Sequence, residues 1–460
     1  MGKRKKTTAA CAKSATEMKP PGSVIGSRRT DRKDNKLMKY QKYLLQNDTR
    51  YKQEIDHMTQ NKAKQNVAGS DPIPSFKPKL VKDYRHGQYS TNNEASNCND
   101  KENNEQGKIT GQTSGYKDIG SVSNSGSVKF SVMSYNILSD NLMKAHPELY
   151  VKCDKADLVW NTRWEGIKQQ IRQHDWPDVI CLQEVQFQSP DHCTDQIVPF
   201  LSHHGYSTVT KHKTGNKYDG CLTAFRKDKF ELEESCPVEY YIDRISVLDR
   251  HNVGLILKLT PVGHGTDGTP LIVANTHLLY NPKRGDIRLC QIALLLAEID
   301  RIQPTPDTPV ILTGDLNSEP ESPVVKLLTR GRFQYSGVKL GRKARRPAPH
   351  KLLPDSLGLS DTCQWQVTCQ QRGNDVSFVT GTGAFQHNLN LASVWRDPRC
   401  VTTYQDGWIT VDYILHSVCD KLQLTGARPL PTAGDMSARI PSKQCPSDHL
   451  PLIADFMLKS

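Results

Sequence analysis

Short runs of apolar residues, separated by polar segments, recur along residues 128–460 and predict a domain of strands and helices. Alternating or fully apolar runs typical of strands occur at 128–138, 178–185, 206–211, 219–226, 236–242, 252–259, 271–275, 310–317, 408–415 and 452–458. Helical spacing of apolar residues occurs at 164–171, 194–204, 285–302 and 321–330. Strands interspersed with helices predict a mixed α/β fold. Residues 331–400 are less regular and include a basic stretch, 342–347, that we expect on the surface.

The first 128 residues lack these patterns and differ in composition. They are rich in Lys, Asn, Gln, Ser, Thr and Gly and poor in aliphatic residues. Such a segment cannot bury enough apolar surface to offset the entropy lost on ordering. They hold 24 Lys and Arg against 13 Asp and Glu, whereas residues 129–460 hold 37 against 36. We therefore expect a basic, disordered tail over 1–128 and one folded domain over 129–460.

The tail leaves two interpretations open. Its basic groups near residues 3–6 and 28–33 could serve as a nuclear import signal or a loose RNA contact, and residues 35–58 could form a helix on an RNA-processing or translation factor. Alternatively, the whole segment is only a solvated tail, because basic runs in such tails are common.

Several features bear on the compartment. No apolar stretch is long enough to span a bilayer, and no apolar segment follows the basic start, which argues against secretion. The 13 cysteines include no Cys-x-x-Cys, and Cys181 and Cys290 lie in apolar patterns typical of a core. We expect reduced thiols, no membrane or disulfide partner, and a cytoplasmic or nuclear protein.

One strand-like run introduces candidate chemistry. The apolar residues 310–312 end at Gly314, and Asp315 and Asn317 follow two residues apart. Alternation along an extended chain would place both side chains on the same side. A carboxylate and an amide there suit a water molecule that must be deprotonated and aimed. The alternative is a strand that ends in a polar turn.

Other predicted strands also end in reactive polar residues. These are Asn136, Glu184, His277 and Asp412, with His449 just before the last strand. Carboxylates together with substrate phosphate oxygens are the usual ligands of Mg²⁺. An Asp–His pair can hold an imidazolium against charge that develops on a phosphoryl group. Each residue alone could be a cap, a turn residue or a core histidine, but together they favour a metal-assisted phosphoester hydrolase.

The same residues carry a family resemblance. The segments that carry it are Ser134–Leu138, Leu182–Val185, Asn275–Leu278, Gly314–Ser318, Val411–Ile414 and Ser447–His449. In this order they resemble the motifs of the endonuclease/exonuclease/phosphatase superfamily. Within it, Asp219–Cys221, Leu248–Gly254 and Thr276–Ile287 are similar to the Angel proteins, in the branch shared with nocturnin and the poly(A) deadenylases.

The resemblance implies a DNase-I-like, four-layer αββα sandwich that depends on Mg²⁺, or alternatively Mn²⁺. By position it implies Glu184 as the principal metal ligand, Asn136 and Asp448 close to metal or phosphate, Asp315 and Asn317 at the attacking water, His277 at the phosphate, and Asp412 with His449 as the catalytic pair. For this family it also implies removal of 2′,3′-cyclic phosphate from RNA ends.

Four functions stay open from sequence. The leading one is hydrolysis of a terminal 2′,3′-cyclic phosphate on RNA, and the second is 3′→5′ exoribonuclease action of the deadenylase kind. Trp408 or Trp395 could stack on an RNA base in either case, although each could equally be a core residue. The third is an RNA-binding or translation-linked adaptor that uses the domain as a scaffold. The fourth is a lipid or inositol phosphatase, because a fold does not fix its substrate.

Overall fold

The computed structural model describes residues 126–188, 190–263, 268–342, 344–366, 380–405, 407–436 and 439–459. The expected tail, 1–128, lies almost entirely outside the described residues, so its disorder and its partners stay predictions. The first described strand, β1, begins at Ser127.

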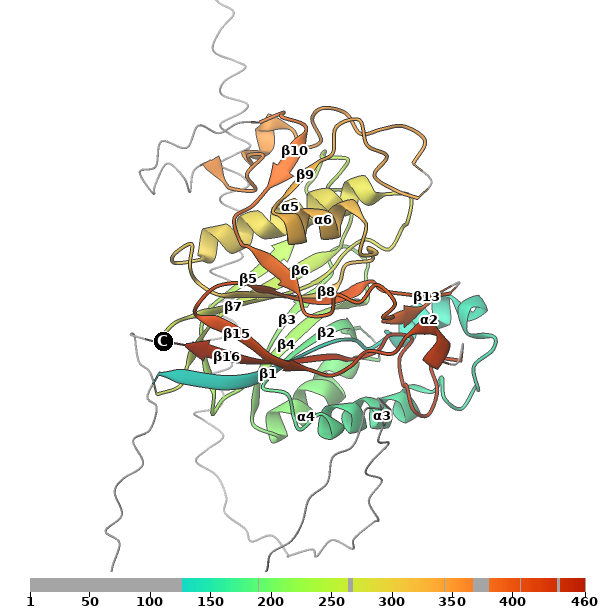
Figure 1. The fold of residues 1–460 in the computed structure, drawn as a ribbon. Coiled ribbons are helices and arrows are strands. Elements are labelled where there is room, and N and C mark those ends of the chain that lie inside the picture. Colours follow the sequence, from blue (N-terminus) through green and yellow to red (C-terminus); the bar gives the residue numbers. More distant parts are fainter. Residues whose placement is uncertain are drawn as a thin grey trace, which may run out of the picture. The chain divides into compact units, whose positions relative to one another are not determined.

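Two six-stranded sheets form the centre of the described fold (Figure 1). The first has the strand order β15-β16-β1-β2-β4-β3 and the second β11-β14-β8-β7-β6-β5. Strands of the first sheet are β1 (Ser127–Asn136), β2 (Val179–Gln186), β3 (Tyr206–His212), β4 (Asp219–Arg226), β15 (Leu422–Ala427) and β16 (Leu452–Lys459). Strands of the second are β5 (Phe230–Glu239), β6 (Val253–Pro261), β7 (Leu271–His277), β8 (Val310–Asp315), β11 (Leu391–Ser393) and β14 (Asp412–Ser417). Two short two-stranded sheets lie outside them: β9 (Arg332–Gln334) with β10 (Ala384–Gln386), and β12 (Thr403–Tyr404) with β13 (Trp408–Ile409).

Helices cover the outer face of each sheet, which produces four layers (Figure 1). The helices are α2 (Asp140–Ala145), α3 (Trp160–Gln173), α4 (Val198–His203), α5 (Gly285–Ile302) and α6 (Pro323–Arg330), with short turns η1 (Pro147–Tyr150), η2 (Cys193–Ile197), η4 (Asp355–Leu357) and η5 (Ala433–Asp435). The apolar side of α3 packs on β1 and β2 of the first sheet, and α5 and α6 pack on the second. The expected αββα sandwich is confirmed.

Strand alternation decides which residues face the space between the sheets. On β1, Met133 and Tyr135 pack in the core under the helices, so Ser134 and Asn136 point to the opposite face, toward the other sheet. On β8, Val310 and Leu312 likewise face the helices. Because side chains alternate along the strand, Asp315 points to the opposite face, toward the other sheet. The polar ends of both sheets thus meet in the middle of the sandwich.

The boundaries of several elements differ from the sequence predictions for physical reasons. The helix at 285–302 is confirmed residue for residue, whereas the strand expected at 236–242 begins earlier, at Phe230. The single strand expected over 408–415 is wrong. It divides into β13 and β14, because the Thr402 hydroxyl accepts the backbone N–H groups of Val411 and Asp412 in place of a neighbouring strand.

The chain around Gly314 also differs from expectation. The strand expected over 310–317 ends at Asp315, and Gly314 adopts a φ of 137°. A Cβ there would overlap the Thr276 carbonyl oxygen of β7, so only glycine lets the two strands approach this closely. Asn317 has a φ of 47°. The extended geometry expected through Asn317 is therefore wrong.

Two further expectations concern the compartment. Cys181 and Cys290 are fully buried core residues, as predicted, and the ten cysteines among the described residues are all free thiols. Across the residues with described structure, we find no helix whose length and apolar character would let it cross a membrane.

Candidate active site

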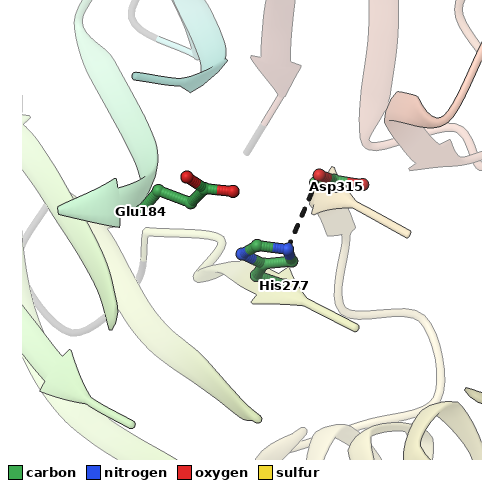
Figure 2. Close-up of side chains that lie close together, drawn as sticks. All are labelled: Glu184, His277 and Asp315. Atoms are coloured by element: carbon green, nitrogen blue, oxygen red, sulfur yellow. Dashed lines mark ion pairs between the residues drawn. The ribbon is translucent and has the colours of Figure 1, made fainter. Parts of the chain in front are cut away.

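The predicted strand-end residues converge between the two sheets. His277 and Asp315 lie opposite each other at the ends of the parallel strands β7 and β8, and Asp412, at the start of antiparallel β14, also pairs with Asp315. Glu184 projects toward them from the other sheet, as Figure 2 shows for Glu184, His277 and Asp315. One ligand atom from each of these three residues lies within 4.8 Å of the other two.

Glu184 reaches the site through a backbone irregularity. The pairing of β2 with β4 shifts register between Leu182 and Val185, and Glu184 adopts a φ of 56°. A left-handed conformation is costly for a residue with a Cβ, and such strain concentrates at functional sites. Burial, together with the charges of Asp448 and Asp219, raises the pKa of the Glu184 carboxyl. This carboxylate is therefore held where a nearby positive charge would stabilise it.

Asn136 lies between the carboxylates of both sheets. It is fully buried, and its Nδ2 donates to Glu184 Oε1 and to Asp315 Oδ2, both at 3.0 Å. Its Oδ1 accepts the backbone N–H of Leu138. Asn136 thus fixes the separation of two carboxylates. If the amide rotated by half a turn, Oδ1 would point into the site in place of Nδ2. Asn136 requires that orientation to coordinate a metal, because only Oδ1 has lone pairs to offer.

Asp315 is almost completely buried, with 2% of its surface exposed. Burial and the neighbouring Asp412 carboxylate raise its pKa to about 7, while His449 opposes the increase. Its Oδ1 accepts the backbone N–H of Asn317 at 2.8 Å, so the turn at Asn317 orients this carboxylate. The Asn317 amide itself donates to the Leu278 carbonyl oxygen. A carboxyl group with a pKa near neutrality is suited to accept a proton from water.

Asp412 and His449 form a buried ion pair. His449 Nδ1 lies 2.9 Å from Asp412 Oδ2, which leaves Nε2 directed toward Asp315 Oδ2 at 3.8 Å. Burial lowers the pKa of His449, but the charge and hydrogen bond of Asp412 outweigh it, and the pKa ends well above its ordinary value. The structure therefore holds an imidazolium whose Nε2 faces the site, 3.5 Å from Asn136 Nδ2.

His277 has the opposite electrostatic character. Burial, Lys213 and His449 lower its pKa well below the ordinary value, so this imidazole is neutral. Its Nε2 lies 3.6 Å from Asp315 Oδ2, and its buried Nδ1 has no hydrogen-bond partner in the described part of the chain. A buried polar atom without a partner is costly, so this ring can take a ligand without losing a contact.

Asp448 is held by a residue that the sequence did not single out. The Tyr150 hydroxyl donates to Asp448 Oδ2 at 2.9 Å, and Tyr150 comes from η1, in the segment that connects β1 to α3. The guanidinium of buried Arg163 donates to the carbonyl oxygens of Ile137 and Leu138. The sequence could have drawn attention to Arg163, because it is a charged residue on the apolar side of a predicted helix. Nothing in the sequence pattern around Tyr150 indicated a role in the site.

A buried cation also escaped prediction. Lys213 Nζ lies 2.5 Å from Asp219 Oδ2, with side chains 9% and 2% exposed. Its charge opposes the raised pKa of Glu184 and contributes to the lowered pKa of His277. Lys213 lies between β3 and the Asp219 motif. Its closeness to that motif in sequence was the one feature that could have indicated a role for it. The site therefore contains a fixed positive charge beside its carboxylates.

Trp408 lies next to this centre. It is half-buried on β13 and packs edge-on against Tyr404, with ring centroids 5.3 Å apart. It lines an open surface pocket of about 530 Å³ together with Glu319 and Arg399. Trp395 lines a neighbouring pocket that reaches Asp412, and its Nε1 donates to the Arg428 carbonyl oxygen.

The donor set fits a hard divalent cation. A second cluster, Asp315, Asp412 and His449, also has atoms within 4.8 Å of one another, but His449 as an imidazolium has no lone pair to offer a cation. Carboxylate oxygens are the ligands that Mg²⁺ and Mn²⁺ prefer. Burial and neighbouring carboxylates raise the pKa values of Glu184 and Asp315, and a cation between them would offset both effects.

The chain matches one protein-family model. Residues 133–449 match the Endonuclease/Exonuclease/phosphatase family. Among curated proteins, it is 36% identical over 371 residues to protein angel homolog 2 of Danio rerio, an alignment that covers 72% of this chain and 64% of that protein. Identity to protein angel homolog 2 of Homo sapiens is 35% over 381 residues, covering 72% and 69% of the two chains. The match thus spans about two thirds of these relatives.

A solved structure is similar over the same region. The crystal structure of ANGEL2 in complex with adenosine-2′,3′-vanadate is 38% identical, with a TM-score of 0.64, and the match covers 72% of this chain and 96% of that one. ANGEL2 is described there as a 2′,3′-cyclic phosphatase. All of the candidate site residues described above lie within residues 133–449, the region that the family model matches.

Proposed function

Because the chain belongs to the endonuclease/exonuclease/phosphatase family, and within it to the Angel proteins, we propose that it hydrolyses the terminal 2′,3′-cyclic phosphate of RNA. The observation that carries this proposal is the meeting of a proton-accepting carboxylate and an imidazolium at one point, Asp315 Oδ2 and His449 Nε2, 3.8 Å apart. The similarity to ANGEL2, a 2′,3′-cyclic phosphatase, supports the choice of substrate.

The reaction needs two hydrolytic steps. In the first, the oxygen of a water molecule bonds to phosphorus and one ring P–O bond breaks, so the cyclic diester becomes a monoester. In the second, another water molecule releases inorganic phosphate and leaves a 2′,3′-diol. Each step requires a base for water and stabilisation of negative charge on the phosphoryl oxygens.

The residues divide these tasks. Asp315 accepts the proton of water, and Asn317 fixes the carboxylate through its backbone N–H. His449, kept protonated by Asp412, donates from Nε2 to a phosphoryl oxygen. Neutral His277 donates a hydrogen bond to another. We place Trp408 at the substrate as a face on which the terminal base stacks.

We assign metal binding to Glu184 as the principal ligand, with Asn136 and Asp448 beside it. A bound Mg²⁺, or Mn²⁺ in its place, would neutralise phosphoryl charge and polarise the phosphorus for attack. Tyr150 keeps Asp448 in position by donating to its Oδ2. Glu184 and Asn136 belong to strands β2 and β1, and Asn136 would turn its amide to offer Oδ1 to the metal.

Two labelled RNAs test the proposal with the full chain and Mg²⁺. One ends in a 2′,3′-cyclic phosphate and the other in a 3′-hydroxyl oligo(A) tail, with Glu184→Ala as the control. We expect the first RNA to lose its terminal phosphate at constant length, and the variant to be inactive. Stepwise shortening of the second RNA would instead identify a 3′→5′ exoribonuclease. Equal activity of the wild-type chain and Glu184→Ala would favour an adaptor function.

A further inference from the structure

One stretch of the domain has a charge that differs from the rest. Residues 322–354 contain nine Lys and Arg and no Asp or Glu, whereas the other residues of 129–460 hold 28 Lys and Arg against 36 Asp and Glu. The folded domain is therefore acidic except in this segment. A charge run of this length on an otherwise acidic domain is a candidate contact for a polyanion.

The middle of this segment, residues 338–342 and 344–346, which we name the basic loop, is fixed at one place on the domain. A Cβ at Gly285, the first residue of α5, would overlap the Leu340 carbonyl oxygen, and a Cβ at Gly341 would lie 2.7 Å from the Lys283 carbonyl oxygen. Two glycines therefore allow the loop backbone to lie directly on the start of α5. Leu340, which is buried, anchors the loop in the core under α5.

That place is the rim of the candidate active site. The backbone N–H of Arg342 donates to the Pro282 carbonyl oxygen, five residues beyond His277. The Arg342 guanidinium pairs with Glu319 at 2.6 Å, two residues beyond Asn317. Arg342 thus bridges the two segments that leave the ends of β7 and β8. Glu319 also lines the pocket that contains Trp408, so the loop continues the surface that runs outward from the site.

The outer side of the basic loop carries cations that are not neutralised. Arg345, Arg346, Lys339 and neighbouring Lys283 are exposed. Within the described ranges, none of these four side chains forms an ion pair or a hydrogen bond. Arg342, by contrast, is paired with Glu319, and Lys343 lies outside the described residues. Four unpaired cations on a fixed backbone form a surface ready for anions.

We propose that the basic loop binds the phosphate backbone of the single-stranded RNA whose 3′ end occupies the active site. This inference rests on the proposed function, because it makes the nucleotides upstream of the terminal one part of the substrate. The carboxylates of the site repel the phosphates of RNA. The positive charges of the basic loop, next to the site, attract those phosphates and offset the repulsion. The loop therefore makes the enzyme prefer an RNA chain over a free nucleoside cyclic phosphate.

Kinetics of the full chain with Mg²⁺ test the proposal. The variant is Arg345→Ala/Arg346→Ala, and the matched control is Arg330→Ala/Arg332→Ala, which removes two exposed arginines of the same basic segment at the far end of α6. The substrates are a 12-nucleotide RNA ending in a 2′,3′-cyclic phosphate and adenosine 2′,3′-cyclic phosphate. A contact to single-stranded nucleic acid contributes about 0.7 to the slope of log affinity against log salt.

Loss of two contacts should therefore raise KM for the RNA about tenfold near 0.15 M salt and reduce that slope by about 1.4. The KM for the nucleoside substrate and the behaviour of the control should not change. Equal effects of the two double variants on the RNA would overturn the proposal. An equal rise in KM for both substrates would do so too, because the loop would then act on the site itself.

Binding measured without catalysis separates this proposal from the proposed function. Fluorescence anisotropy of a labelled 12-nucleotide RNA with the full chain in EDTA reports affinity even if no substrate is hydrolysed. Weaker binding by Arg345→Ala/Arg346→Ala than by the control would support the basic loop whatever the reaction. If the wild-type chain then failed to hydrolyse the cyclic phosphate, only the proposed function would be wrong.

Discussion

Replacing Asp315 with asparagine should stabilise the metal-free protein at pH 8, although it removes a residue that we place in the reaction. Burial and Asp412 raise the pKa of this carboxyl from 3.8 to about 7. A difference of about three pKa units corresponds to about 4 kcal/mol, at 1.36 kcal/mol for each unit. Asn136 would lose one hydrogen bond to Oδ2, which costs about 1 kcal/mol. We therefore expect a net gain of about 3 kcal/mol.

The sign of the pH dependence follows from proton binding. Between pH 3.8 and about 7 the folded state keeps a proton on Asp315 that the unfolded chain has already lost. Stability of the wild-type protein attributable to this group therefore falls as pH rises through that window and stays low above it. The asparagine variant lacks this dependence, so its advantage should be absent near pH 4 and complete by pH 8.

Thermal unfolding in EDTA from pH 4 to pH 8 measures this difference. Asp412→Asn is the matched control, because it removes the partner of a buried imidazolium and should destabilise the protein. That loss should be largest at low pH and shrink as pH rises through the raised pKa of His449. Mg²⁺ should raise the melting temperature of the wild-type chain more than that of Asp315→Asn. An asparagine variant that is less stable at pH 8, or a difference that is constant with pH, would refute the reasoning.

Three further predictions address neighbouring residues. His449→Ala should lower the rate of cyclic phosphate hydrolysis by a factor on the order of 10²–10⁴ with unchanged RNA affinity in EDTA, and a loss below tenfold in steady-state kinetics would contradict its role. Tyr150→Phe removes the hydrogen bond to Asp448 and should raise the Mg²⁺ concentration for half-maximal rate several-fold, which a metal titration at saturating RNA measures; an unchanged midpoint would argue against it. Lys213→Met should cost about 3–5 kcal/mol, because it leaves Asp219 buried and unpaired, and adding Asp219→Asn should recover most of that stability in denaturant unfolding.

The sequence identified polar residues that converge in the structure wherever such a residue ends a buried strand. Asn136, His277 and Asp315 end three strands that are apolar and regular, and the parallel pairings of β1 with β2 and of β7 with β8 bring such ends to one edge. Period-2 alternation then determines which face each side chain occupies.

Prediction failed where the backbone leaves regular geometry. Glu184 and Asn317 have positive φ values, so alternation along an extended chain could not describe how either side chain is aimed. The register shift at Glu184 depends on β4, which is far along the chain. Tyr150 and Lys213 reach the site from connecting segments without periodicity, and only the tertiary structure shows that they touch Asp448 and Asp219.

The basic loop illustrates why charge alone does not locate a contact. The sequence shows the cluster at 342–347 and predicts that it is exposed, but exposed cations can lie anywhere on a domain. Its position depends on Gly285 and Gly341, whose missing side chains let two backbones meet, and on Glu319, which draws Arg342 toward the end of β8. A substitution at Gly285 should therefore displace the loop from the rim and weaken RNA binding while the cations themselves remain. The cations of the basic loop attract RNA, and the backbone contact at Gly285 and Gly341 places them beside the site where we propose that the RNA end binds.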